Sequence, residues 1–413
     1  MRPPFPATVL LLLFLGSPGL ADETTPREIK YRYELRYELI LDPDRELVPI
    51  RIVLGEGARH VRWLRFRLDP ERHLEPRADG ELVLEPPYAT WTPPDEGGAL
   101  SLQHRLDHER GKSGFDARIT ADWALFRGDD LIPPATLRQR KGAEADATLH
   151  VKLPRGWSMV APYREIRDGV FRVEASGRSF DRPVGWMLAG RIGVRRERID
   201  DISVAVAAPN NQDVRRMDIL AFLNWNLPAL HELAPGMPKR LLIVSARDDM
   251  WRGGLSGPRS LYIHSERPLI SENGTSTLMH ELVHVALTID TTPKADWIVE
   301  GLAEYYSLEL MRRAGTISDR RFQRALKTLA EWGREAPGLA GDNATGAVTA
   351  LAVGVMHCLD QEIQERTEGK TNLDDIVDRL ANSHPVSVAA LREAAGNALG
   401  RPSRCLESTR LGQ

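Results

Sequence analysis

Two short helical segments decide the fold of this chain: His280-Glu281-Leu282-Val283-His284, and Asp296-Trp297-Ile298-Val299-Glu300-Gly301-Leu302-Ala303-Glu304-Tyr305. Residues four apart lie on the same face of a helix, so the imidazoles of His280 and His284 can converge on one metal ion. Glu281 lies beside them, where its carboxylate can reach a water molecule on that metal. Glu300 on the second helix would be a third ligand and leave one position open for water, as in a catalytic Zn²⁺ site. The alternative is a pair of surface histidines on an amphipathic helix, which leaves the Glu300 helix unexplained.

The first 21 residues have the pattern of a secretory signal peptide. Arg2 precedes an apolar run over residues 7–15, and the small residues Gly19 and Ala21 suit cleavage by signal peptidase. No cysteine follows the cleavage point, which argues against a lipoprotein. We therefore expect an exported protein, periplasmic or secreted, with no membrane span after signal removal. A retained N-terminal anchor is the alternative.

Composition narrows the class of protein further. The formal net charge of the 413-residue chain is −3 and no basic tract occurs, so the sequence gives no support for nucleic-acid binding. The two cysteines, Cys358 and Cys405, can pair in an oxidising compartment. Cys358 also falls on the apolar face of a predicted helix, so a buried free thiol is the alternative. The sequence carries no signal for an oligomeric state.

The pattern of apolar residues changes from strand to helix near residue 211. Short alternating runs before that point, such as 59–67, 148–153 and 202–206, predict strands separated by proline and glycine. After it, residues 239–246 and 260–265 read as buried strands on either side of a flexible loop at 253–258. Helices are predicted at 213–233, 275–289, 319–334, 347–364, 372–381 and 387–399, and Pro228 should end or kink the first of them.

The two metal-site segments resemble the gluzincin metallopeptidases, the thermolysin-like zinc enzymes with two histidine ligands and one glutamate ligand. More narrowly, the chain resembles the glycyl aminopeptidase family over roughly residues 115–385. Three weaker marks carry this narrower resemblance: Phe180-Asp181-Arg182-Pro183-Val184-Gly185, Gly253-Gly254-Leu255, and Arg366-Thr367-Glu368-Gly369-Lys370-Thr371-Asn372-Leu373-Asp374-Asp375.

The resemblance implies an α+β protein with two domains. We expect a signal peptide at 1–21, an N-terminal β-sandwich-like domain at 22–210, and a thermolysin-like catalytic domain, a small sheet with a helical lobe, at 211–413. The PDZ-like module that the family often carries is expected to be missing.

The resemblance also implies roles for the metal-site residues. His280, His284 and Glu300 would hold Zn²⁺, which lowers the pKa of a bound water to near 7 and polarises a carbonyl. Glu281 would be the general base that accepts the water's proton and passes it to the leaving amine. Glu304 lies one turn beyond Glu300 and could orient a ligand imidazole, although a surface carboxylate is the alternative.

Two positions depart from the family pattern. In the family, the substrate loop that matches Gly253, Gly254 and Leu255 continues with a glutamate that can hold the substrate's free amino terminus, and here that position is Ser256. The family's transition-state tyrosine would align with Asn343, since no tyrosine follows Tyr306. Both changes weaken the case for aminopeptidase activity, and neither affects the metal ligands.

Two functions follow from these observations. The first is an exported zinc-dependent metallopeptidase with altered specificity, which cuts peptide or protein substrates internally rather than trimming amino termini. The second is a catalytically weak or inactive protein of the cell envelope that keeps zinc for stability and binds a peptide or a protein partner.

Overall fold

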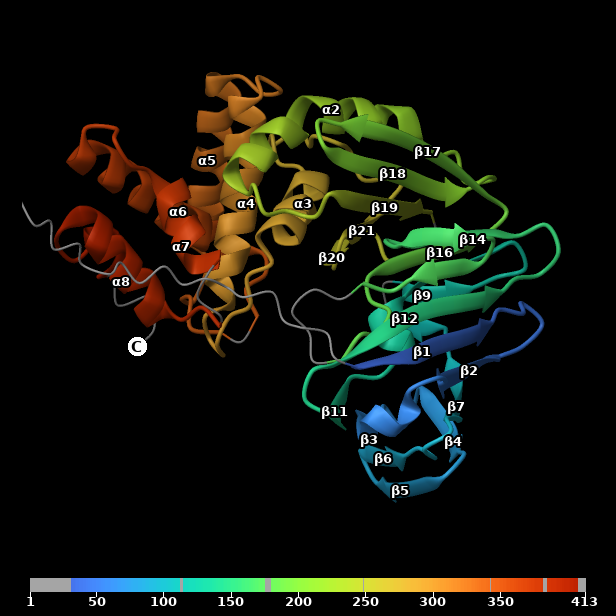
Figure 1. Ribbon diagram of the computed structural model, residues 1–413. Helices are drawn as coiled ribbons and strands as arrows, with labels where there is room; N and C mark the ends of the chain where they lie inside the picture. Colours follow the sequence, from blue (N-terminus) through green and yellow to red (C-terminus); the bar gives the residue numbers. More distant parts are fainter. Residues whose placement is uncertain are drawn as a thin grey trace, which may run out of the picture.

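The computed structural model describes residues 31–111, 114–174, 180–247, 249–341, 343–381 and 385–407. The predicted signal peptide lies outside these residues. The described chain is an α+β protein in which β-sheets come first and helices dominate the second half (Figure 1). Within the described residues, no helix combines the length and the apolar character that crossing a bilayer needs.

Three sheets form the N-terminal half. The seven-stranded sheet contains, in spatial order, β14 (Arg164–Arg167), β15 (Val170–Arg172), β12 (Ala143–Lys152), β1 (Tyr31–Ile40), β2 (Leu47–Leu54), β7 (Gly98–Arg105) and β4 (His73–Ala78). The five-stranded sheet contains β13 (Ser158–Val160), β16 (Trp186–Gly190), β10 (Trp123–Arg127), β9 (Phe115–Ile119) and β8 (His108–Glu109). The four-stranded sheet contains β11 (Ala135–Gln139), β3 (Val61–Arg67), β6 (Tyr88–Thr92) and β5 (Glu81–Glu85). Two short helices, η1 (Ala58–His60) and α1 (Gly128–Leu131), connect strands.

One hydrophobic core joins these three sheets. Alternate residues of β1, such as Leu35 and Tyr37, are buried, as expected for a strand with one face on a core. They pack in one cluster with Phe66 and Trp91 of the four-stranded sheet and with Met187 of β16. The alternating apolar residues of β1 therefore form the face of the strand that is buried in the core.

A fourth sheet supports the metal-site helices. Its strands, in order, are β17 (Ile192–Ile199), β18 (Ile202–Pro209), β19 (Arg240–Ala246), β21 (Ser260–His264) and β20 (Gly254–Gly257). β18, β19 and β21 are parallel, whereas β17 and β20 are antiparallel edges. Helix α2 (Arg216–Leu233) packs on β17 and β18 (Figure 1).

This sheet corrects two sequence-based expectations. The sequence predicts a domain boundary at 210, but β18 pairs with β19 and β17 pairs with β18, so this boundary separates strands of one sheet. Residues 253–258 were predicted as a flexible loop, but Gly254–Gly257 is an edge strand paired with β21. Sheet partners lie far apart in the sequence, and a glycine-rich strand lacks the apolar alternation by which strands are recognised.

The fourth sheet packs against the five-stranded sheet through a separate core. Trp186 and Leu188 of β16 are fully buried against Leu242 and Val244 of β19. The rings of Trp186 and Tyr262 have centroids 5.3 Å apart. The helix-bearing sheet is thus fixed to the β half by aromatic packing.

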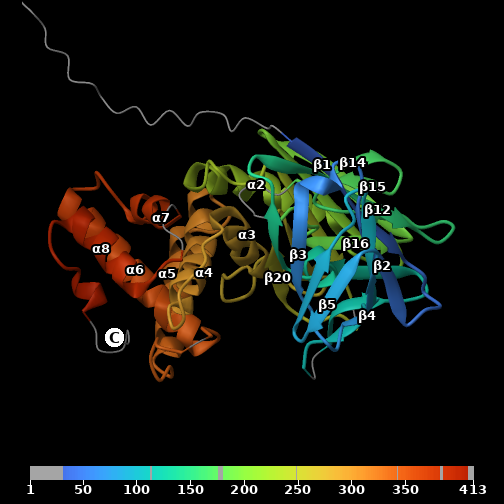
Figure 2. The ribbon, with the colours of Figure 1, turned by 60° about the horizontal axis from the view of Figure 1, so that its bottom comes forward.

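The helical lobe lies to one side of the sheets (Figure 2). It contains α3 (Thr277–Leu287), α4 (Asp296–Arg313), α5 (Asp319–Gly333), α6 (Ala347–Thr367), α7 (Leu373–Ala381) and α8 (Val388–Leu399). These bounds match the predicted helices to within a few residues. In α2, however, the helix starts at Arg216 and continues through Pro228, because Leu227, Leu230 and Leu233 are held in the core of the lobe.

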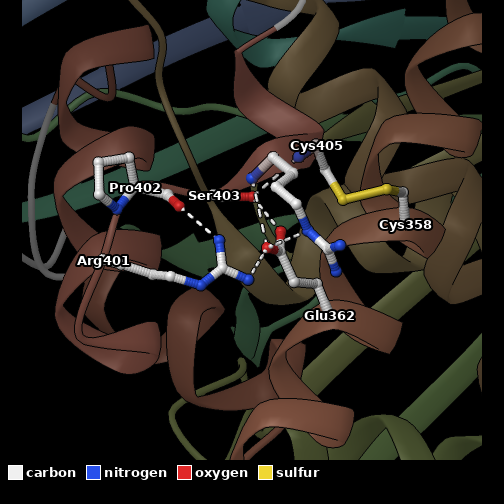
Figure 3. Close-up of a disulfide and its surroundings, with 7 residues drawn as sticks. Cys358, Glu362, Arg401, Pro402, Ser403 and Cys405 are labelled. Atoms are coloured by element: carbon white, nitrogen blue, oxygen red, sulfur yellow. Dashed lines mark hydrogen bonds and ion pairs between the residues drawn. A yellow bond between two sulfur atoms is a disulfide. The ribbon is translucent and has the colours of Figure 1, made fainter.

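Cys358 of α6 and Cys405 of η2 (Arg404–Leu406) form a disulfide (Figure 3). Cys358 is exposed and lies off the buried face of α6, so the alternative of a buried free thiol is wrong. Beside the disulfide, the buried carboxylate of Glu362 accepts hydrogen bonds from Arg401 at 2.6 Å and Ser403 at 2.6 Å. The segment after α8 is therefore attached to α6 by a covalent bond and by an ion pair to the buried carboxylate of Glu362.

Candidate metal centre

The packing of α3 and α4 brings the three candidate ligands together. The side chain of Ser276 caps α3 by accepting a hydrogen bond from the backbone N–H of Met279 at 3.2 Å. Leu282 and Val283 of α3 are buried in the lobe core with Ile298 and Leu302 of α4. These contacts turn the polar faces of the two helices toward each other.

The ligand atoms have the spacing of a tetrahedral metal site. The Nε2 atoms of His280 and His284 are 3.1 Å apart. Glu300 Oε2 lies 3.3 Å from His280 Nε2, and Oε1 lies 3.4 Å from His284 Nε2. Two atoms bound to a tetrahedral zinc ion at 2.0–2.1 Å are about 3.3 Å apart. The three residues therefore fit Zn²⁺. Among the described residues, they form the group of His, Cys, Asp or Glu side chains that has all its ligand atoms within 4.8 Å of one another.

Glu304 contacts the other face of the His280 ring. Its Oε2 is 2.9 Å from His280 Nδ1. Because an ionised carboxylate only accepts hydrogen bonds, Nδ1 donates to Glu304 and Nε2 is directed to Glu300 and His284.

The carboxylates favour positive charge between the two imidazoles. Burial raises the pKa of Glu300, but hydrogen bonds from His280 and His284 outweigh it and lower the pKa to about 2. Burial lowers the pKa of His280, but hydrogen bonds to Glu300 and Glu304 outweigh it and raise the pKa well above its ordinary value. The negative charge of these carboxylates would also stabilise a divalent cation bound between the imidazoles.

Glu281 faces the edge strand β20. It is 8% exposed, and its neighbour across the site is Gly254. A Cβ atom at position 254 would lie 2.8 Å from Glu281 Cγ and 2.7 Å from Thr277 Cγ2. Only glycine lets β20 approach α3 this closely, so Gly254 determines where the Glu281 carboxylate can lie.

A cavity of about 500 Å³ opens beside His284. One side of the cavity is formed by the C-terminal part of α3 and the residues that follow this helix, including Thr288 and Asp290. Residues 256–259, from the end of β20 and the turn that follows it, also line the cavity. Of the predicted substrate loop, Ser256 lines this cavity and Gly254 touches Glu281. Leu255 instead packs toward the core between the sheets, and Gly253 lies against the ring of Trp251.

Asn343 is exposed in the connection between α5 and α6 and is not among the described residues that line this cavity. The next residue ties the connection to the metal-site helix, because the backbone N–H of Ala344 donates to Asp296 Oδ2 at 2.7 Å. Sequence reasoning missed Arg259 and Glu174, which line the cavity. No local motif marks either residue, because Arg259 lies in the turn between β20 and β21 whereas Glu174 follows β15, far away in the sequence.

Comparison with known proteins agrees with this geometry. No protein-family model matches the chain, and no curated protein matches its sequence. Among solved structures, an aminopeptidase N family protein from Idiomarina loihiensis matches over 91% of this chain and 74% of its own, with 12% identity and a TM-score of 0.64. An M1 zinc metallopeptidase from Deinococcus radiodurans matches over 91% of both chains, with 16% identity and a TM-score of 0.59.

The chain has the fold of the M1 zinc metallopeptidases. A two-domain M1 zinc metallopeptidase mutant bound to L-tryptophan is also similar, with 15% identity, a TM-score of 0.59, and 91% of this chain and 92% of its own covered. The predicted gluzincin fold related to aminopeptidases is thereby confirmed. At these identities the likeness concerns the fold, and the chemistry must be argued from the residues of this chain.

Proposed function

We propose that this protein is an exported zinc-dependent metallopeptidase that cuts peptides internally. The observation that carries the proposal is the 3.1–3.4 Å spacing of the His280, His284 and Glu300 ligand atoms beside the Glu281 carboxylate. Zn²⁺ held by these three residues would supply a water with a pKa near 7 and polarise the scissile carbonyl. The likeness in fold to M1 zinc metallopeptidases supports the same class of enzyme.

Glu281 is the proton carrier in this proposal. Its carboxylate, which lies beside Gly254 of β20, accepts a proton from the attacking water and then donates it to the leaving amine. The edge strand β20 positions the substrate, since its outer backbone N–H and C=O groups can pair with an extended peptide.

Two features favour internal cleavage. Ser256 has no carboxylate with which to bind a free amino terminus. The cavity also continues past Ser256 along Gly257, Pro258 and Arg259, so substrate residues upstream of the scissile bond have room. Peptides with free and with acetylated amino termini are therefore expected to be cut at similar rates.

Export rests on the signal-like N-terminus and is supported by the Cys358–Cys405 disulfide, because disulfides persist in oxidising compartments. Cell fractionation and amino-terminal sequencing test it. The expected mature protein begins at Asp22 in the periplasm or medium.

The decisive experiment is hydrolysis of a mixed peptide library by the zinc-loaded protein and by Glu281→Gln. We expect the wild type to cut, the variant to lose at least 10²-fold in rate as general-base loss predicts, and both to contain about one zinc per chain by elemental analysis. Equal hydrolysis by the two proteins would contradict the proposal. Zinc binding without any hydrolysis would support the alternative, a zinc-stabilised binding protein.

A further inference from the structure

Arg259 brings a cation into the cavity beside the metal site. It occupies the turn between β20 and β21, and its backbone oxygen accepts a hydrogen bond from Leu242 N at 3.0 Å. Its side chain is 24% exposed and lines the same cavity as His284. Among the described lining residues it is the only lysine or arginine.

The conformation of Arg259 calls for a compensating contact. Its φ of +58° is left-handed, a conformation that L-residues other than glycine rarely adopt. Its ion pair with Glu174 is loose, with Arg259 Nη1 and Glu174 Oε2 3.7 Å apart and Glu174 58% exposed. Such an exposed pair contributes little, so it does not account for an arginine at this turn.

The other charged groups of the cavity leave room for an anion at Arg259. Asp290, which follows α3, and Glu174 both line the cavity, and both are exposed to solvent. Ser256 and Thr288, which also line the cavity, carry neutral polar side chains. A carboxylate that reaches Arg259 can replace Glu174 as its partner and form a shorter, forked pair.

We propose that Arg259 selects substrates that carry an aspartate or glutamate upstream of the scissile bond. This inference rests on the proposed peptidase function and on the direction in which the cavity extends. The family's glutamate at position 256 marks the amino-terminal end of a trimmed substrate, and Arg259 lies beyond that position. An acidic side chain upstream of the cut is therefore the group that arrives at Arg259.

Binding tests the inference separately from catalysis. Zinc-loaded Glu281→Gln is titrated with acetylated fluorescent peptides in which a single glutamate is moved along the sequence or replaced by glutamine. At one upstream position, the peptide with glutamate is expected to bind about 10–100-fold more tightly than the peptide with glutamine, because glutamate forms a charge-assisted hydrogen bond with Arg259. The preference should disappear in Glu281→Gln/Arg259→Asn, in which asparagine tolerates the left-handed turn.

The matched control is Glu281→Gln/Arg240→Gln, which removes an exposed arginine of the same sheet outside the cavity and should keep the preference. Zinc content and melting temperature verify that each variant is folded. Equal binding of glutamate and glutamine peptides, or no peptide binding at all, overturns the inference. Selective binding without hydrolysis by the wild type would instead refute the proposed peptidase activity and leave the role of Arg259 in place.

Discussion

Glu304 Oε2 lies 2.9 Å from His280 Nδ1, so one carboxylate of α4 orients the ring whose other nitrogen meets Glu300. The two glutamates are four residues apart and project from the same face of the helix. A single helix thus carries a candidate ligand and the residue that positions another ligand. In the proposed zinc site, this arrangement would make the affinity for zinc depend on the packing of α4 against α3.

Glu304→Gln should weaken zinc binding by about 10–100-fold, because the negative charge that raises the basicity of the His280 ligand is lost. Competition with a fluorescent chelator measures the affinity. Glu331→Gln, an exposed change on α5, serves as the control and should bind zinc like the wild type. Unchanged affinity in Glu304→Gln would show that the 2.9 Å contact does not tune the site.

Gly254→Ala should reduce hydrolysis at unchanged zinc content. The new Cβ would lie 2.8 Å from Glu281 Cγ, a distance that forces the general base or β20 to shift. A displacement of about 1 Å at a reacting group can cost about 10²-fold in rate. Gly236→Ala, at a cavity glycine with open space around it, is the control. Full activity in Gly254→Ala would mean that Glu281 is not held by this approach.

The metal helices were predictable because their signal is local. His280 and His284 are four residues apart, Ser276 is a good capping residue, and the apolar positions between them repeat with helical period. The helices from α4 to α8 were recognisable for the same reason. Their bounds could be read without knowing what they pack against.

The cavity was not predictable because it is made by long-range pairing. Gly254–Gly257 becomes a strand only through its register with β21, and this pairing also sets the turn that carries Arg259. β17 and β18 join the fourth sheet through a parallel pairing of β18 with β19, whose partner residues are 37 positions apart. Alternation shows that a segment is a strand, but it does not name the strand's partner.

Removing the disulfide should destabilise the helical lobe. The cross-link closes a loop of 47 residues, for which chain entropy predicts about 4 kcal/mol of stabilisation. Cys358→Ser/Cys405→Ser should therefore unfold at lower urea concentration when helix content is followed by circular dichroism. Reductant should shift the wild type to the same midpoint and leave the variant unchanged. A reductant-insensitive wild type would contradict the pairing.

The β half should lose stability in mild acid through His104. Burial, with smaller contributions from His73 and Arg72, lowers the pKa of His104 from 6.5 to about 2. Below pH 6.5 the unfolded chain binds a proton at His104 that the folded chain does not bind. The free energy of unfolding therefore decreases as the pH is lowered, by up to about 1.4 kcal/mol per pH unit. His104→Leu should flatten this slope in urea titrations between pH 7 and 5. Identical slopes in the wild type and in His104→Leu would refute the assignment.

Asn343→Tyr should raise the rate of hydrolysis by tenfold or more. Negative charge develops on the carbonyl oxygen as a peptide bond is attacked, and losing one preorganised donor to that oxygen costs about 10²–10³ in rate. The family's tyrosine supplies this donor, and the shorter amide of Asn343 reaches less far. The connection that carries Asn343 is fixed to α4 by the 2.7 Å hydrogen bond from Ala344 N to Asp296 Oδ2, one turn before Glu300.

Turnover and zinc content of Asn343→Tyr and Asn343→Ala are compared with those of the wild type. The tyrosine variant should gain rate at unchanged zinc content, because the new hydroxyl acts on the substrate rather than on the metal ligands. Thr345→Ala, at an exposed position on the same connection, controls for a general effect on the loop. If Asn343→Ala leaves the rate untouched and Asn343→Tyr adds nothing, position 343 does not reach the reacting carbonyl. The interpretation that Asn343 limits the rate then fails, and the metal centre is unaffected.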